Sequence, residues 1–79
     1  MGIIREFAEG RFAGKVAKRI GIKIGVPADS FHPEVKLMLL EMGTMLYQSG
    51  HRSVDETADL ILETPSISDM FKEIVNSRR

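Results

Sequence analysis

Cysteine, long apolar runs and catalytic motifs are all missing from this sequence. Without cysteine, neither a disulfide nor a thiolate-bound metal can stabilise the fold. The longest apolar run covers only residues 37–40, whereas a membrane-spanning helix needs about 20 apolar residues. The first ten residues carry acidic side chains where a secretion signal is apolar, and Glu6 stands where a myristoylation signal has serine or threonine. We therefore expect the protein to be cytoplasmic.

The chain is short enough to form only one domain, and we assign residues 1–79 to it. A domain of this size buries only about 60–65% of the surface that its unfolded chain exposes, so its margin of stability is small. Because no covalent crosslink is available, the fold must depend on packing, on a bound partner or on self-association.

Side chains suited to catalysis or metal binding are few and scattered. His32 and His51 have no second ligand at the spacing typical of a metal site. Four carboxylates on one side of a predicted helix have the pattern of a solvated surface: Asp55, Glu56, Asp59 and Glu63. Nucleophile motifs such as Gly-x-Ser-x-Gly are absent, and so short a chain has little room for a substrate pocket. We expect a protein that is not an enzyme and that requires no cofactor, metal or small-molecule substrate.

Apolar side chains repeat with the period of an α-helix, and this predicts an all-α fold. The expected compact bundle has about four short helices, at residues 3–20, 33–49, 54–63 and 67–77. The helix at 33–49 is apolar nearly all round, so we expect the other helices to pack around it. Gly10 and Gly14 lie about one helical turn apart, and their ordinary role would be close packing against that central helix.

Residues near the predicted helix ends suit capping roles. Gly21 suits the end of the first helix, so residues 22–26 are expected to form an extended connector. Ser53 fits the first position of a capping box at the start of the third helix. A serine, either Ser66 or Ser68, is expected to cap the fourth helix.

Charge is distributed unevenly along the chain, although its total is zero. Residues 1–25 hold six basic and two acidic side chains, whereas residues 26–79 hold five basic and nine acidic ones. Four basic residues share one side of the first predicted helix: Arg11, Lys15, Lys18 and Arg19. This stripe indicates either an anionic partner or attraction to the acidic third helix, in the same chain or in a second copy. We expect the second.

The segment at residues 10–25, GRFAGKVAKRIGIKIG, shares features with three functional motifs. A phosphate-binding P-loop is excluded because Val16 follows Lys15, where the motif has a hydroxyl residue. A DNA-reading helix would have to contain Gly25 and Pro27, which argues against a helix-turn-helix. An interfacial membrane helix fits better, with apolar side chains opposite the basic stripe at Phe12, Val16 and Ile20. A helix packed on a protein core has the same pattern and is commoner.

The helix at 33–49 has two apolar sides, one rich in methionine (Met38, Met42 and Met45) and one at Leu37, Leu40 and Tyr47. Three short neighbours are too few to cover both, and an uncovered apolar side is typical of an interface. We therefore predict a non-enzymatic module that binds copies of itself or another protein, with six candidate interface residues: Leu37, Leu40, Tyr47, Ile3, Ile4 and Phe7. The alternative is a peripheral binder of an anionic surface, phospholipid or nucleic acid, through Arg11, Lys15, Lys18 and Arg19.

Overall fold

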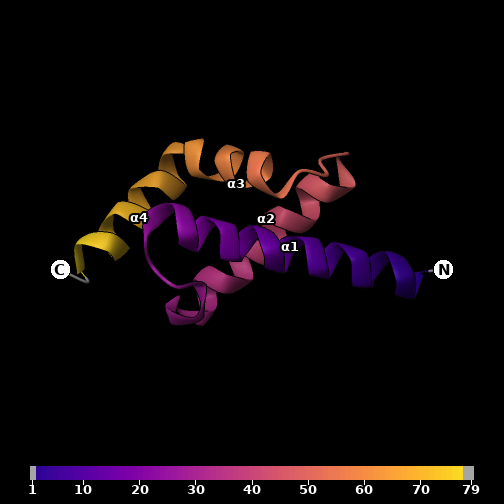
Figure 1. The fold of residues 1–79 in the computed structure, drawn as a ribbon, viewed down its shortest axis with the longest axis horizontal. Coiled ribbons are helices and arrows are strands. Elements are labelled where there is room, and N and C mark those ends of the chain that lie inside the picture. Colours follow the sequence, from indigo (N-terminus) through magenta and orange to yellow (C-terminus); the bar gives the residue numbers. More distant parts are fainter. Residues whose placement is uncertain (1, 78–79) are drawn as a thin grey trace.

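Four α-helices and one short 3-10 helix make up the computed structural model, which describes the backbone of residues 2–77 and the side chains of residues 7–77 (Figure 1). The elements in chain order are α1 (Gly2–Ile24), the 3-10 helix η1 (Ala28–Ser30), α2 (Pro33–Gln48), α3 (Val54–Glu63) and α4 (Pro65–Ser77). No strand occurs among these residues, and the predicted all-α bundle of four helices is confirmed. None of the described helices is both long and apolar enough to cross a membrane.

Helix α1 continues past its predicted end at residue 20 and stops at Ile24. The amides of Gly25 and Val26 both donate to the carbonyl of Gly21, at 2.9 and 3.0 Å, which closes the last turn of the helix. Gly25 has a φ of +77°, a conformation that glycine adopts without strain at a helix end. The predictions of a helix end at Gly21 and an extended connector at residues 22–26 are therefore wrong.

Gly21 is required for a different reason, which is the path of the chain after α1. A Cβ atom at this position would lie 2.7 Å from the carbonyl oxygen of Val26 and 3.0 Å from the amide nitrogen of Ala28. The missing side chain therefore lets the turn fold back across the helix. This return path brings Val26 and Phe31 into the core, where each is 4% exposed.

Helix α1, and not α2, is the helix on which α2, α3 and η1 pack, whereas α4 packs on α3. Helix α1 contacts α2, α3 and η1, and it begins at one end of the longest dimension of the molecule while α4 ends at the other (Figure 1). Four of its apolar residues are buried: Phe12, Ala13, Val16 and Ile20. In α2 only Leu39 and Gly43 are buried. Helix α3 covers α1 and makes few contacts with α2, so one apolar side of α2 stays uncovered.

Helices α1 and α2 are in close contact at Ala13 and Gly43. A Cβ atom on Gly43 would lie 3.0 Å from both the Cα and the Cβ of Ala13, so the two helices touch through small residues. An added Cβ on Gly10 or Gly14 would meet no atom within 4 Å. The predicted role of these two glycines in close helix packing is therefore wrong.

The remaining helix ends follow local capping chemistry. The His32 imidazole Nδ1 accepts a hydrogen bond from the amide of Glu34 at 3.2 Å, at the start of α2. The Ser53 hydroxyl accepts from the amide of Glu56 at 3.3 Å, and α3 has its predicted bounds. Helix α4 begins at Pro65, earlier than predicted, which places Ser66 and Ser68 inside the helix. Because both lie within the helix, neither serine is its N-cap. Pro65 occupies the first helical position, for which proline is well suited.

Candidate interaction surfaces

The outer side of α2 carries three exposed apolar side chains, which we call the α2 stripe: Leu37, Leu40 and Met45. Their exposed fractions are 58%, 38% and 65%. Leu40 and Met45 line one shallow hollow of about 400 Å³ on this side of the helix. Leu37 precedes Leu40 by three residues, a spacing that places neighbouring side chains on the same side of an α-helix. Glu41 and Thr44 line the same hollow, so the stripe is a group of neighbouring apolar side chains with a carboxylate and a hydroxyl among them.

The apolar surface continues from α2 onto α3. A groove of about 420 Å³ runs between these helices, and Met45 lines it together with Met42, Leu46 and Leu60. Leu60 of α3 is itself 40% exposed. Methionine side chains are flexible and polarizable, so they adapt to partners of different shape. The groove therefore widens the surface that the α2 stripe offers.

The six predicted interface residues have different environments. Leu37, Leu40 and Phe7 are exposed. Tyr47 is half-buried, with its ring centroid 5.2 Å from that of Phe12, so its ring belongs to the contact between α1 and α2. The side chains of Ile3 and Ile4 lie outside the described residues. Sequence reasoning missed Leu60, because its neighbours on α3 gave no sign that the packing of α2 leaves it uncovered.

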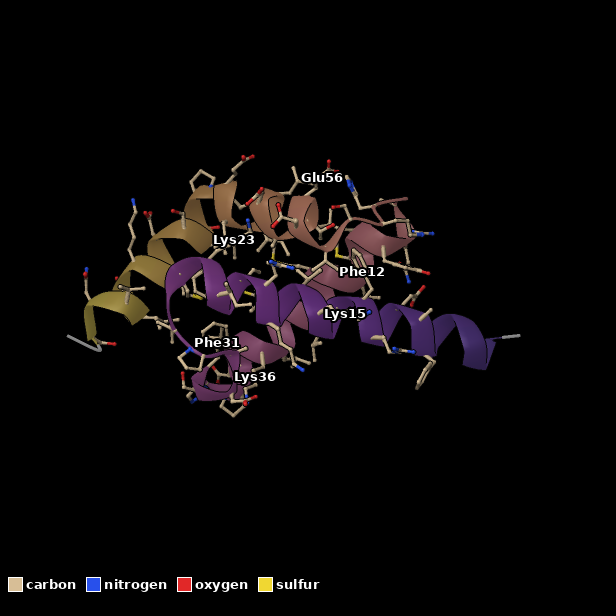
Figure 2. All side chains as sticks on the ribbon, viewed as in Figure 1. Phe12, Lys15, Lys23, Phe31, Lys36 and Glu56 are labelled. Carbon is tan, nitrogen blue, oxygen red and sulfur yellow. The ribbon has the colours of Figure 1, made fainter. Side chains whose placement is uncertain are left out.

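The outer side of α1 carries the four predicted cations, which we call the basic face: Arg11, Lys15, Lys18 and Arg19. All four side chains are exposed, and none forms an ion pair with a carboxylate among the described residues. Lys15 is labelled on α1 in Figure 2. The expectation that this stripe meets the acids of α3 is therefore wrong within the chain, and contact with the acids of a second copy stays a prediction.

The acids of α3 that reach α1 contact Lys23 instead. The Lys23 ammonium lies 3.0 Å from Asp55 and 2.9 Å from Asp59, on the side of α1 that faces α3 (Figure 2). Hydrogen bonds to Asp59 and then to Asp55 hold the pKa of Lys23 above its ordinary value of 10.5. This contact requires α1 to remain helical to Ile24, which is why a sequence prediction that ended the helix at residue 20 missed it.

Two large apolar side chains share the outer side of α1 with the basic face. Phe7 is 65% exposed and Ile22 is 71% exposed. At the helical repeat of 100° per residue, Phe7, Arg11, Lys15, Lys18 and Ile22 fall within about 80° of one another. The Arg11 guanidinium lies 5.7 Å from the centroid of the Phe7 ring. Sequence reasoning missed Ile22, because it placed this residue in a connector.

The apolar residues predicted to insert into a membrane are in the core instead. Phe12 is 7% exposed, and Val16 and Ile20 are fully buried. The amphipathic pattern of α1 is thus that of a helix packed on a protein core. Any surface that binds α1 must contact its outer side.

The described residues do not form a metal centre. No group of three or more histidine, aspartate or glutamate side chains is placed to hold a metal ion within this part of the chain. His32 serves as the N-cap of α2. His51 lines the groove between α2 and α3.

Comparison with models of known protein families, with curated proteins and with solved structures found no match for this chain. Functional inference therefore depends on the α2 stripe and on the outer side of α1.

Proposed function

We propose that this protein is a non-enzymatic interaction module that binds a copy of itself, or another protein, through the α2 stripe. The observation that supports this proposal is the exposure of Leu37, Leu40 and Met45 on α2, with Leu60 of α3 beside them. An apolar surface of this kind on a small domain is typical of a protein interface. The chain has no disulfide that could stabilise so small a fold. Burying the exposed apolar side chains in an interface would therefore also stabilise it.

The expected strength of self-association is modest. Each of these four side chains is about half exposed, so burying what remains contributes about 1 kcal/mol per residue. A symmetric dimer buries the set twice and gains roughly 8 kcal/mol. Association itself costs at least about 4 kcal/mol in lost translational and rotational freedom. The net gain is therefore at most about 4 kcal/mol, and we expect a concentration-dependent dimer with a dissociation constant of about 1 mM.

Sedimentation velocity at protein concentrations up to about 1 mM tests the proposal. Leu37→Glu and Leu40→Glu should each shift the chain to the monomer mass without loss of helicity, because a carboxylate in an apolar interface is strongly disfavoured. Ile22→Glu is the matched control, since Ile22 is also an exposed aliphatic residue but lies on α1. It should leave the dimer intact. A parent chain that is monomeric at every concentration up to about 1 mM refutes self-association.

The basic face supports a second candidate function, binding to an anionic surface. Its four cations are exposed and have no carboxylate partner among the described residues, so their charge is available to a partner. Binding of this kind weakens as salt increases, because salt screens the attraction. If the partner is duplex DNA, each neutralised phosphate adds a slope of roughly −0.9 to the dependence of log affinity on log salt.

A further inference from the structure

We infer that the anionic surface is a lipid membrane, along which α1 lies with Phe7 and Ile22 inserted among the lipids. This inference rests on the second candidate function, because it names the partner of the basic face. The membrane would contact the outer side of α1, both at the basic face and at the two exposed apolar residues Phe7 and Ile22.

The order of side chains along α1 fits a helix lying flat on a bilayer. Phe7 and Ile22 stand at the two ends of the face, with Arg11, Lys15 and Lys18 between them. At the rise of an α-helix this face is about 22 Å long. Interfacial helices combine apolar side chains that enter the acyl boundary with cations that contact the anionic headgroups. Both kinds of side chain are present here on one outer side.

The rest of the fold keeps this side of α1 directed outward. The opposite side of the helix holds Phe12, Val16 and Ile20 in the core, so α1 cannot roll to present another surface. Asp55 and Asp59 of α3 form ion pairs with Lys23, so their charges do not neutralise the basic face. The face therefore reaches a membrane as a preformed basic helix with exposed apolar ends.

A small hollow on the basic face suits a lipid headgroup. It has a volume of about 220 Å³ and is lined by Lys15, Lys18, Arg19, Ile22 and Val54. Three cations there stand beside two aliphatic side chains from α1 and α3. A phospholipid presents the matching chemistry, an anionic phosphate joined to apolar chains.

The exposed apolar residues favour lipid over nucleic acid. The four cations would contact phosphates in either partner. Nucleic-acid grooves that hold single strands use aromatic side chains for stacking on bases, and the aliphatic Ile22 cannot act in this way. The Ile22 side chain is 71% exposed, and transferring it from water into the acyl region of a bilayer lowers the free energy.

Binding to vesicles tests this inference. The parent chain is mixed with vesicles of phosphatidylcholine that either contain or lack phosphatidylglycerol, and with duplex DNA, at physiological ionic strength. We expect binding only to the vesicles that contain phosphatidylglycerol. Replacing Phe7 and Ile22 together by serine should weaken this binding at least tenfold, because two apolar side chains lose their burial. Replacing Lys15, Lys18 and Arg19 by glutamine should weaken it on the order of 100-fold.

Lys72→Gln is the matched control for the lysines of the basic face, because Lys72 is an exposed lysine on α4. It should leave vesicle binding unchanged, and weakening equal to that of Lys18→Gln would overturn the placement of α1 on the membrane. A Phe7→Trp variant adds a test that needs no loss of binding, since the chain has no tryptophan of its own. Its fluorescence should shift to the blue when anionic vesicles are added, and an unchanged spectrum would contradict insertion.

The failure of this inference is distinguishable from that of the second candidate function. Binding to DNA without binding to anionic vesicles would overturn the lipid inference and leave an anionic partner for the basic face. Binding to neither would overturn both.

Discussion

Replacing Gly21 by alanine should destabilise the fold, although alanine is the better helix former. In an open position within a helix, this substitution stabilises by about 1 kcal/mol. At Gly21 the new Cβ would lie 2.7 Å from the Val26 carbonyl oxygen and 3.0 Å from the Ala28 amide nitrogen. Both atoms belong to the backbone, so no side chain can rotate to make room. The turn after α1 must move, and it carries Val26 and Phe31 out of their core positions.

The size of the effect follows from these opposing contributions. Forcing extra volume into a packed site costs typically 1–3 kcal/mol, and a backbone clash belongs at the upper end of that range. Subtracting the gain in helix propensity leaves a net loss of about 2 kcal/mol. For a domain of this size, each 1 kcal/mol lowers the Tm by roughly 4–8 °C. We therefore expect a Tm about 8–16 °C below that of the parent chain.

Gly10 and Gly14 provide matched controls within the same helix. No atom would lie within 4 Å of a Cβ at either position, so each alanine variant should gain about 0.5–1 kcal/mol. The measurement is urea unfolding followed by far-UV circular dichroism, at one protein concentration because self-association would shift the midpoint. A Gly21→Ala variant as stable as the parent, or as stable as the controls, would refute the close contact between α1 and its following turn.

Two other predictions concern contacts at α3. Ser53→Ala should lower the free energy of unfolding by about 1 kcal/mol, the usual loss when an N-cap hydroxyl is removed. Urea unfolding measures this change, and an unchanged midpoint would contradict the prediction. Lys23→Gln should lower stability slightly, because the partners Asp55 and Asp59 are more than half exposed and solvent screens the pair. Because the pKa of Lys23 is raised in the folded chain, this contribution is present below pH 10.5 and is lost as the pH rises through the folded value. The gap in urea midpoint between parent and variant should therefore be constant near neutral pH and close above pH 10.5, and a gap that persists there would contradict the ion pair.

Local sequence was sufficient where one residue's chemistry decides a boundary. The bounds of α3 follow from the Ser53 hydroxyl, which serves the amide of Glu56, and the start of α2 follows from Pro33 after His32. The composition of the basic face was also predictable, because helical phase alone places Arg11, Lys15, Lys18 and Arg19 on one side. These features depend on atoms within a few residues of each other.

Tertiary packing decided the features for which several residues were locally equivalent. Gly21 and Gly25 both suit a helix end, and the choice of Gly25 lets Val26 and Phe31 reach the core while Lys23 reaches α3. Helices α1 and α2 both have wide apolar surfaces, and α1 became central because α3 covers it and leaves Leu37, Leu40 and Met45 of α2 exposed. A pattern of apolar residues indicates which side chains favour burial. Whether they are buried depends on where the other helices lie. For this reason the exposure of the α2 stripe was decided by the fold as a whole.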